Sequence, residues 1–323
     1  MSVLVYTENW DGKFKKLSFE LASYGAKLAE MLKTGLVAVS IGKVEEAELK
    51  KLGQFGVGRI FSINDNFLNT HDSQTYARVI SQVAQQVEAQ VVLLGFTNSG
   101  KAIAPRISVR LHAALASGVN QLPLGTDPFV VSKKVFSGGA FAKLTLNTKT
   151  KVITLAQNSY ELSEKPVNCS IENLSLEIEA NSIKTRVVET QKQGGKILLT
   201  DAEIVVAGGR GMKSADNWQP ILELAELLSA ATACSRPVSD EGWRPHEEHT
   251  GQTGKIIAPN LYIAVGISGA TQHLAGVSSS KFIVAINSDK SAPIFESAQY
   301  GIAGDALKVL PQLVEAVKKM KLK

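Results

Sequence analysis

IVVAGGRG at residues 204–211 and LYIAVGISGA at residues 261–270 are the stretches that decide the fold class of this sequence. Each begins with a short apolar run, typical of a strand buried on both faces, and passes into a loop of small residues. Apolar residues at helical spacing follow in 216–228 and 306–317, and a further apolar run occupies 282–286. Repeated strand–loop–helix units of this kind predict a doubly wound α/β domain.

The first half of the chain alternates β-branched runs with segments of helical period, which predicts a parallel-rich sheet with crossover helices. Strands are expected at 3–6, 36–41, 59–63 and 91–95, and helices at 17–32, 45–52, 73–87 and 102–111. Between 129 and 157, alternating apolar residues are separated by Gly138-Gly139 and Asn147-Thr148. This pattern predicts antiparallel strands added to the same sheet.

The segment 176–197 is polar and contains Gly194-Gly195, which predicts a connection between an N-terminal α/β domain at 1–190 and a C-terminal domain at 191–323. A hinge at 185–197 would let the C-terminal domain swing toward its partners. The length of 323 residues fits two domains. With 44% hydrophobic and 20% charged residues, the composition is that of a globular protein rather than a disordered chain or a membrane bundle.

The charge pattern and the cysteines exclude several classes of protein. The net charge is only +5, and like charges form no long block apart from a loose lysine tail at 318–323, which argues against nucleic-acid and anionic-membrane partners. No uncharged apolar run approaches the roughly 18 residues that span a bilayer, so no membrane insertion is expected. Cys169 and Cys234 form no CxxC motif, so neither a disulfide framework nor a zinc site is expected. Two isolated cysteines fit a reducing compartment, and the first residues lack the features of a signal peptide. Both observations favour the cytoplasm.

Three motifs are similar to catalytic signatures but depart from them. Residues 95–101 have the GxxxxGK frame of a phosphate-binding loop, yet Ala102 stands where Ser or Thr would bind magnesium, so a structural turn is expected. The loop 266–270 misses the GxSxG elbow because its last glycine comes one residue early, which leaves Ser268 as a hydroxyl donor. The cluster 246–249 is not HExxH and is interpreted as a solvated loop rather than a metal site.

Small residues also fill three strand-to-helix junctions, at 207–211, 266–270 and 301–305. Such loops either form tight turns or let backbone amides approach a phosphate at a helix N-terminus. Their spacing does not match GxGxxG, but two strand–loop–helix units and a third loop within one domain favour a nucleotide-type site. The loops alone do not identify the cofactor.

Polar and cationic residues accompany these loops at Ser235-Arg236, 251–255 and Gln272-His273. No paired carboxylates and no nucleophile with its base lie among them. The set therefore suits binding an electron-rich ring and tuning its charge better than acid–base turnover. The spacing alone is equally compatible with a structural role for each: Arg236 in a surface ion pair and His273 as a helix cap.

These segments together closely resemble the alpha subunit of electron transfer flavoproteins. The resemblance is strong over 204–313, in the runs Ser235-Arg236, 251–255, 261–276, 285–287, 292–295 and 300–305. It is weaker in the first half, where it rests on Gly100-Lys101 with Pro105-Arg106.

The resemblance implies a heterodimer with a beta subunit and FAD held mainly by the C-terminal domain. Electrons would be accepted from acyl-CoA and related dehydrogenases, as in fatty acid beta-oxidation, and passed one at a time to a membrane quinone reductase. The chain would be an electron carrier without substrate turnover of its own. Its first half would pack on the beta subunit and hold no nucleotide, because the family's AMP belongs to that subunit.

The resemblance also implies roles for individual residues. Arg236 would lie against the isoalloxazine ring and stabilise its reduced form, Thr253 would hydrogen-bond the reactive ring nitrogen, and His273 would lie near the pyrimidine carbonyl. The remaining contacts would be Ser235, Gln252 and Gly254 along the flavin and ribityl chain, Arg210, Ser268, Gly269 and Gln272 at the diphosphate, and Asn287 and Asp305 at the adenosine end. His249 departs from the glutamine common in the family, and a titratable ring there would make the potential vary with pH.

Three other classes of protein are compatible with these loops. A nicotinamide-dependent oxidoreductase or the middle domain of a thiamine enzyme would need a general base in a substrate pocket, and the sequence offers no convincing one. A bifurcating flavoprotein complex that uses NADH is poorly distinguished by the alpha chain alone. A structural regulator that has lost flavin is disfavoured, because the residues assigned to the flavin are retained together.

Overall fold

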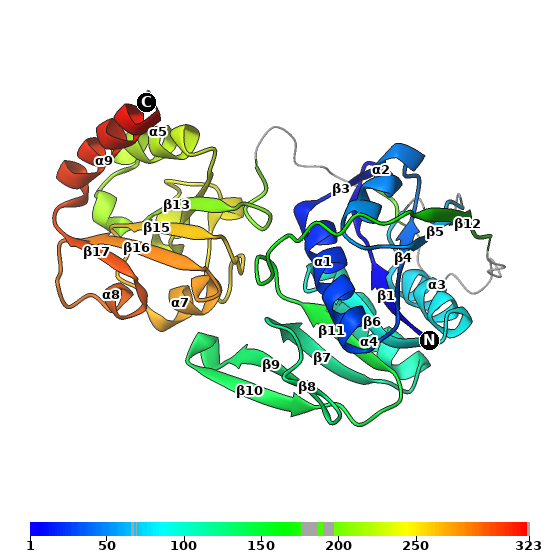
Figure 1. Cartoon of the computed structure of the whole chain (residues 1–323). Helices are drawn as coiled ribbons and strands as arrows, with labels where there is room; N and C mark the ends of the chain where they lie inside the picture. Colours follow the sequence, from blue (N-terminus) through cyan, green and yellow to red (C-terminus); the bar gives the residue numbers. More distant parts are fainter. Residues whose placement is uncertain (66–67, 69, 176–186, 190–196, 322–323) are drawn as a thin grey trace. The chain divides into compact units, whose positions relative to one another are not determined.

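The computed structural model describes residues 1–65, 68, 70–175, 187–189 and 197–321. Most of the hinge expected at 185–197 lies outside the described residues. The chain divides into two compact units, Met1–Val135 with Ala140–Thr190 and Phe136–Gly139 with Gln191–Lys323. One unit contains a large, mostly parallel mixed sheet and the other a smaller parallel sheet, which confirms the predicted fold class (Figure 1).

The first unit is built on one sheet in the order β10-β9-β7-β11-β6-β1-β4-β5-β12, with β8 paired to β9. Its strands are β1 (Ser2–Tyr6), β4 (Gly35–Ile41), β5 (Arg59–Ile63), β6 (Ala89–Gly95), β7 (Ala114–Val119), β8 (Gly125–Thr126), β9 (Phe129–Val135), β10 (Ala140–Thr145), β11 (Lys151–Leu155) and β12 (Ser170–Asn173). A separate ribbon joins β2 (Asn9–Trp10) to β3 (Lys13–Phe14). The helices are α1 (Lys16–Met31), α2 (Glu46–Lys50), α3 (Ser73–Gln86) and α4 (Asn98–Arg110).

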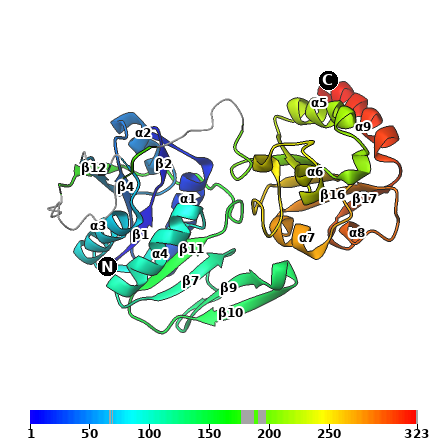
Figure 2. The ribbon, with the colours of Figure 1, turned by 180° about the vertical axis from the view of Figure 1, so that it is seen from behind.

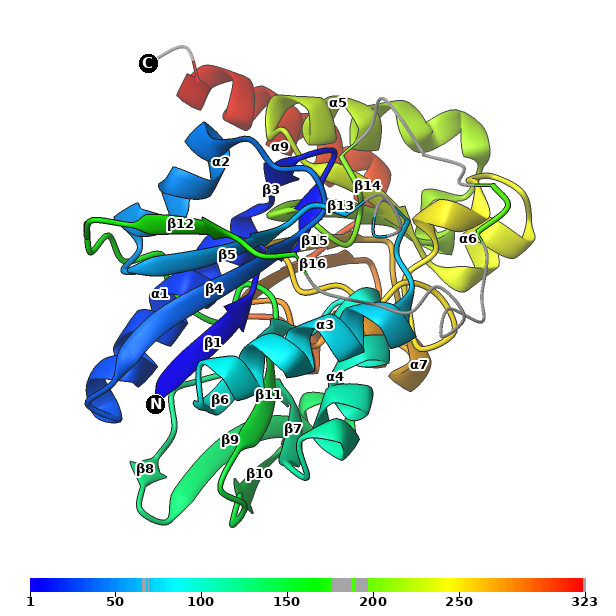
Figure 3. The same cartoon turned by 90° about the vertical axis from the view of Figure 1, so that its right-hand side faces the viewer.

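Alternating side chains of the central strands of this sheet enter two apolar cores, one on each face. Val3 and Val5 of β1 belong to the core that contains residues of α1. Leu4 and Tyr6 belong to the core that contains residues of α3 and α4. Helix α1 therefore covers one face of the sheet, and α3 and α4 cover the other (Figures 2 and 3).

The expected direction of one strand is wrong. β9 and β10 are antiparallel, as predicted, but β11 runs parallel to both β6 and β7 and lies between them. Two hydrogen bonds place the start of β11 beside the starts of those strands, because Thr148 Oγ1 accepts from Ala114 N at 2.8 Å and Thr150 Oγ1 donates to Ala89 O at 3.1 Å. The chain thus returns to the amino edge of the sheet before β11 begins, and a short alternating pattern does not reveal such a return.

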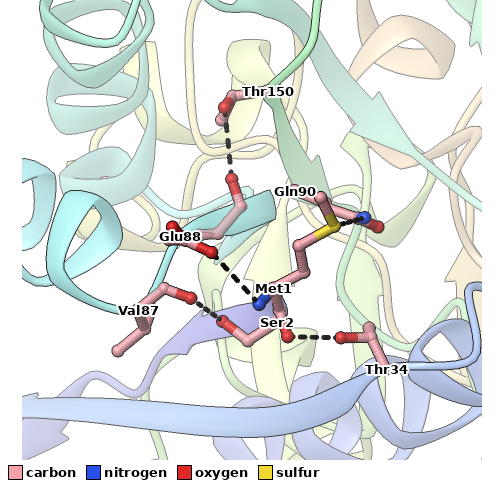
Figure 4. A network of polar contacts seen from close by, with 8 residues as sticks. Met1, Ser2, Thr34, Val87, Glu88, Gln90 and Thr150 are labelled. Atoms are coloured by element: carbon pink, nitrogen blue, oxygen red, sulfur yellow. Dashed lines mark hydrogen bonds and ion pairs between the residues drawn. The ribbon is translucent and has the colours of Figure 1, made fainter.

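Polar contacts also anchor the start of β1 at this amino edge (Figure 4). Ser2 Oγ donates to Val87 O at 3.1 Å, and the Met1 amino group lies 3.7 Å from Glu88 Oε2. Thr34 Oγ1 donates to the Met1 carbonyl oxygen. The first residues of β1 are therefore tied to the segments that enter its two parallel neighbours, β4 and β6.

The second unit has five parallel strands in the order β14-β13-β15-β16-β17. They are β13 (Ile204–Gly208), β14 (Ala231–Cys234), β15 (Leu261–Val265), β16 (Phe282–Asn287) and β17 (Tyr300–Ala303). The helices are α5 (Gln219–Leu227), α6 (Arg236–Asp240), α7 (Thr271–Val277), α8 (Ile294–Ser297) and α9 (Ala306–Lys321). α5 and α9 pack on one face, and α7 and α8 on the other (Figure 1). No helix within the described ranges is long and apolar enough to cross a membrane.

Candidate functional site

The strand order of the second unit defines where a ligand would bind. β13 comes first along the chain, and its neighbours β14 and β15 come second and third, so the direction of winding reverses between β13 and β15. In open α/β sheets, ligands bind outside the carboxyl ends of the strands at this reversal. Arg210 follows β13, and Ser268 and Gly269 follow β15. Residues predicted for the diphosphate therefore flank the reversal on both sides.

The other strands bring further predicted residues to the same edge of the sheet: Ser235 and Arg236 follow β14, Asn287 ends β16 and Asp305 follows β17.

A long loop before β15 carries His249, Gln252, Thr253 and Gly254. Its Thr250 N donates to the Cys234 carbonyl oxygen at 3.0 Å, and Gln252 N donates to the Gln272 carbonyl oxygen at 2.7 Å. These bonds hold the loop between the end of β14 and the start of α7, which carries Gln272 and His273.

The glycines of the first two junctions allow the loops to pack against one another. Gly209 N donates to Val265 O at 2.8 Å, and Gly211 N donates to Gly266 O at 3.0 Å. A Cβ on Gly211 would lie 2.7 Å from Gly266 Cα. Gly266 itself has a φ of +63°, in the left-handed region that favours glycine. At these positions glycine therefore permits close backbone contact between the loops on either side of the reversal.

Two buried imidazoles lie at this edge. His273 is 7% exposed and its Nε2 is 2.8 Å from Tyr262 Oη, whereas His249 is 3% exposed. The Nδ1 atom of each ring is buried and has no hydrogen-bond partner. Burial lowers the pKa of His273 to about 4, and burial followed by the charge of His246 lowers the pKa of His249. Both rings are therefore neutral at pH 7, and any titration of His249 falls in the acidic part of the pH range.

Arg236 forms the ion pair that the sequence left as an alternative. Its side chain is 66% exposed, and its Nε donates to Asp240 Oδ2 at 3.3 Å along α6. An exposed pair of this kind contributes little to stability, so the guanidinium is free to leave it at small cost. The structure therefore places an exposed, weakly paired cation beside the end of β14.

Asn287 and Asp305 are engaged in contacts within the protein. Asn287 Nδ2 donates to Ile267 O at 2.9 Å, which ties the end of β16 to the loop after β15. Asp305 Oδ1 accepts from Leu307 N at 3.0 Å, and Lys213 Nζ lies 3.3 Å from Asp305 Oδ2. These two bonds lower the pKa of Asp305, the backbone one most. Both residues hold loops in place, and their contact with an adenosine group stays a prediction.

The expectation of a solvated loop at 246–249 holds for His246 and Glu247, which are exposed, but is wrong for Glu248 and His249. The segment His246–Glu248 is a short 3-10 helix, and Glu248 and His249 are buried. The cause is a bidentate pair in which Arg244 Nε and Nη2 donate to the two Glu248 carboxylate oxygens at 2.8 and 2.6 Å. Within the described residues, no group of three or more His, Cys, Asp or Glu side chains is placed to hold a metal ion.

In the GxxxxGK motif of the first unit, residues 95–101, the backbone packs tightly against itself. A Cβ on Gly100 would overlap the carbonyl oxygen of Gly95. Thr97 caps α4, since its Oγ1 accepts from Gly100 N at 2.9 Å and donates to Glu8 Oε1 at 2.6 Å. Lys101 Nζ lies 4.3 Å from the centre of the Phe96 ring. The residues of this motif thus make contacts of a structural turn.

Comparison with known proteins identifies the family. Residues 3–205 match the family model described as an electron transfer flavoprotein domain, and residues 198–278 match the electron transfer flavoprotein FAD-binding domain. The chain is 35% identical over 321 residues to the electron transfer flavoprotein subunit alpha of Bacillus subtilis strain 168, covering 99% of this chain and 98% of that one. The chain belongs to the electron transfer flavoprotein family, as an alpha subunit.

Other relatives agree with this membership. The alpha subunit of Thermoanaerobacterium thermosaccharolyticum is 33% identical over 99% of this chain and 98% of its own length. The acryloyl-CoA reductase electron transfer subunit beta of Anaerotignum propionicum is 31% identical over 99% and 96%. A solved structure of a putative thiamin diphosphate-dependent enzyme from Mycobacterium smegmatis has 10% identity and a TM-score of 0.25, over 97% of this chain and 59% of that one, which is too low to support an inference. The family resemblance stated from the sequence is confirmed.

The residues at the carboxyl edge fit FAD, the cofactor of the family domain matched by 198–278. A buried polar atom without a partner is costly, so the unpartnered Nδ1 atoms of His249 and His273 indicate that a hydrogen-bonding group belongs beside them. Arg236 adds a cation that is free to contact a ring on which negative charge develops. The electron transfer flavoprotein fold thus places hydrogen-bonding groups and exposed cations, Arg210 and Arg236, at a single edge.

Sequence reasoning missed two polar residues of this site. Tyr262 is fully buried in β15, and Thr250 is 1% exposed in the loop before it. The Tyr262 hydroxyl lies 2.8 Å from His273 Nε2, and Thr250 Oγ1 donates to the Cys234 carbonyl oxygen at 3.3 Å. The only local signal was a tyrosine within the apolar run LYIAV, since a buried tyrosine hydroxyl usually has a hydrogen-bond partner.

Proposed function

We propose that this alpha subunit pairs with a beta subunit, holds FAD at the carboxyl edge of the β13–β17 sheet, and transfers electrons one at a time from acyl-CoA-type dehydrogenases to a membrane quinone reductase. The observation that carries the position of FAD is the convergence, at the strand-order reversal, of loops that contain two buried imidazoles with unpartnered nitrogens. FAD supplies the ring that takes up and releases electrons. The chain then needs no substrate turnover of its own.

The residues nearest the ring would act through charge and hydrogen bonding. Arg236, released from its weak pair with Asp240, provides a positive charge against the ring. Thr253 is exposed on the loop and presents a hydroxyl for a ring nitrogen. His273 is held rigidly by its bond to Tyr262 and remains neutral. We infer that these three side chains set the flavin potential.

The rest of the predicted set would hold the remainder of the cofactor. Ser268 is exposed in the loop before α7 and Gln272 is exposed at the start of α7, and both side chains would contact a diphosphate there. Ser235 and Gly254 lie against the loops that frame the ring, and Arg210 is exposed beside the reversal. The place of action would be the cytoplasm, where Cys169 and Cys234 remain free thiols.

Copurification with the candidate beta subunit, followed by visible absorbance and reductive titration, tests this function. Arg236→Ala should lower the potential of the bound flavin, because a cation about 4 Å from a developing charge is worth about 1 kcal/mol in water and about 4 kcal/mol near a protein surface. Arg110→Ala, an exposed arginine of α4 in the first unit, is the matched control and should leave the potential unchanged. A colourless complex that also fails to take up added FAD would refute the proposal.

A further inference from the structure

Four loops at the carboxyl edge of the second sheet are linked to one another, and one further contact closes them into a ring. Gly211 N, after β13, donates to Gly266 O, after β15, at 3.0 Å. Asn287 Nδ2, at the end of β16, donates to Ile267 O in that same loop at 2.9 Å. Gly304 N, after β17, donates to the Asn287 carbonyl oxygen at 2.9 Å. Each of these contacts joins the ends of two neighbouring strands, so the sheet order itself brings the partners together.

The contact that closes the ring is the ion pair between Lys213 and Asp305. Lys213 Nζ, in the loop after β13, lies 3.3 Å from Oδ2 of Asp305, which follows β17. β15 and β16 lie between these two strands, so the sheet alone leaves β13 and β17 about 14 Å apart. The apolar core on the α5 and α9 face brings the two loops together, because it contains both Met212 and Ala306, the chain neighbours of the pair.

The backbone at Lys213 shows that the turn itself does not call for a lysine. Its φ is +68°, in the left-handed region that favours glycine, and Lys213 N donates to Arg210 O at 3.0 Å within the turn. A residue kept in such a conformation points to a use for its side chain. What lysine adds at this position, and glycine would not, is an ammonium group beside Asp305.

Asp305 is held from its other side by its own helix. Its Oδ1 accepts from Leu307 N at 3.0 Å at the start of α9, while its Oδ2 faces Lys213. The two contacts together fix the orientation of the carboxylate. A carboxylate has about four lone-pair sites, so Asp305 is still able to accept from hydroxyl groups. The adenosine part of FAD carries ribose hydroxyls, and the resemblance implies that Asp305 lies at that end of the cofactor.

We propose that Lys213 is a positioning residue, which holds the Asp305 carboxylate in place for the adenosine part of FAD and so slows release of the cofactor. Its contact is with Asp305, and its effect on the cofactor passes through that carboxylate. The identity of the ligand rests on the proposed function, whereas the ring of loops does not. The side chains of Lys213 and Asp305 are 62% and 36% exposed, so salt should screen the pair and weaken the effect.

The rate at which the complex with the beta subunit releases FAD measures this role. The FAD-loaded complex is diluted, and the fluorescence of the released flavin is followed. At about 0.01 M salt, Lys213→Met should release FAD about fivefold faster than the wild type, the factor that corresponds to about 1 kcal/mol for an exposed pair. At about 1 M salt, where the screening length is about 3 Å, the ratio of the two rates should fall below about twofold. Lys213→Arg keeps the charge and should restore slow release.

Two further variants separate this role from a loss of stability. Lys213→Gly removes the cation but suits the left-handed backbone, so urea unfolding should show no loss of stability, while FAD release should be as fast as in Lys213→Met. Lys308→Met is the matched control, because it removes an exposed lysine from the first turn of α9 and leaves the pair with Asp305 intact. Its release rate should stay within about twofold of the wild type.

A double variant tests whether the effect passes through Asp305. Adding Lys213→Met to Asp305→Asn should accelerate release no further than Asp305→Asn alone. The inference is overturned if Lys213→Met releases FAD at the wild-type rate, if the ratio of rates does not depend on salt, or if Lys213→Gly retains slow release. A complex that binds no FAD would overturn the proposed function as well, whereas a wild type that binds FAD with an unchanged Lys213→Met overturns this inference alone.

Discussion

Replacing Gly276 by alanine should disturb the candidate site through a single methyl group. Gly276 lies in α7, three residues after His273, and packs directly on the loop that carries Gln252 and Thr253. A Cβ at this position would lie 2.5 to 2.7 Å from the backbone N, Cα and C of Gly251. These are backbone atoms, so no side-chain rotation relieves the overlap, and the loop has to move away from the helix.

The magnitude follows from two opposing terms. Alanine is favoured over glycine inside a helix by about 1 kcal/mol. Overpacking a buried contact costs about 1–3 kcal/mol. The loop resists displacement because Ile257 N donates to Gly276 O at 2.8 Å and Gln252 N donates to Gln272 O at 2.7 Å. We expect a net loss of up to about 2 kcal/mol in the free energy of unfolding, together with weaker retention of FAD.

Urea unfolding followed by tryptophan fluorescence is the assay, because two of the three tryptophans, Trp218 and Trp243, lie in the second unit. Gly25→Ala is the control within a helix, since a Cβ there meets methyl groups of Leu36 and Val5 at 2.9 Å, and side-chain ends shift more easily than backbone. Gly276→Ala should be less stable than Gly25→Ala by at least about 1 kcal/mol. Equal stabilities with unchanged FAD retention would refute the reasoning.

Three further predictions concern charges of the second unit. The pKa of His273 is about 4 in the folded state and 6.5 in the unfolded state, so the unfolded chain binds more protons between these pH values. The free energy of unfolding should therefore fall by about 3 kcal/mol as the pH drops through this window. Urea titrations at several pH values should show this slope in the wild type and a flatter slope in His273→Gln. Glu248→Gln leaves the largely buried Arg244 unpaired and should lower the free energy of unfolding by about 3 kcal/mol, a loss that calorimetry would detect. Asp240→Asn breaks only the exposed pair with Arg236, so it should change stability by less than about 0.5 kcal/mol, and a larger loss would contradict the freedom assigned to Arg236.

The sequence patterns correctly predicted elements whose residues carry a clear apolar run or helical periodicity. The apolar runs at 204–207 and 261–265 became buried parallel strands, because such runs have no polar face to leave in water. The helix expected at 216–228 begins as a 3-10 turn and continues as α5 to Leu227. β14 and β17 were missed, because runs of only four residues carry little strand signal.

Long-range pairing decided what the patterns did not. The alternating pattern predicted that the strand at β11 is antiparallel. It is parallel, because the chain returns to the amino edge of the sheet, where Thr148 and Thr150 form hydrogen bonds, before β11 begins. Glu248 and His249 were predicted to be solvated because their charged neighbours are visible in the sequence. The Arg244–Glu248 pair that allows Glu248 to be buried is a feature of three-dimensional geometry. Charged residues leave water only when paired, and sequence spacing does not show pairing.

The sequence by itself determined the fold class, the family and the residues expected to contact FAD. The apolar strand runs, the glycine junctions and the family motifs are all patterns of neighbouring residues, so they can be recognised without the fold. Only the tertiary structure decided that these residues share the carboxyl edge of one sheet, since the strand order is set by pairing between distant segments. It also revealed two buried polar contacts at this edge, from Thr250 Oγ1 to the Cys234 carbonyl oxygen and between the Tyr262 hydroxyl and His273 Nε2. Hydrogen-bond direction depends on which atoms meet, and that is known only once the chain is folded.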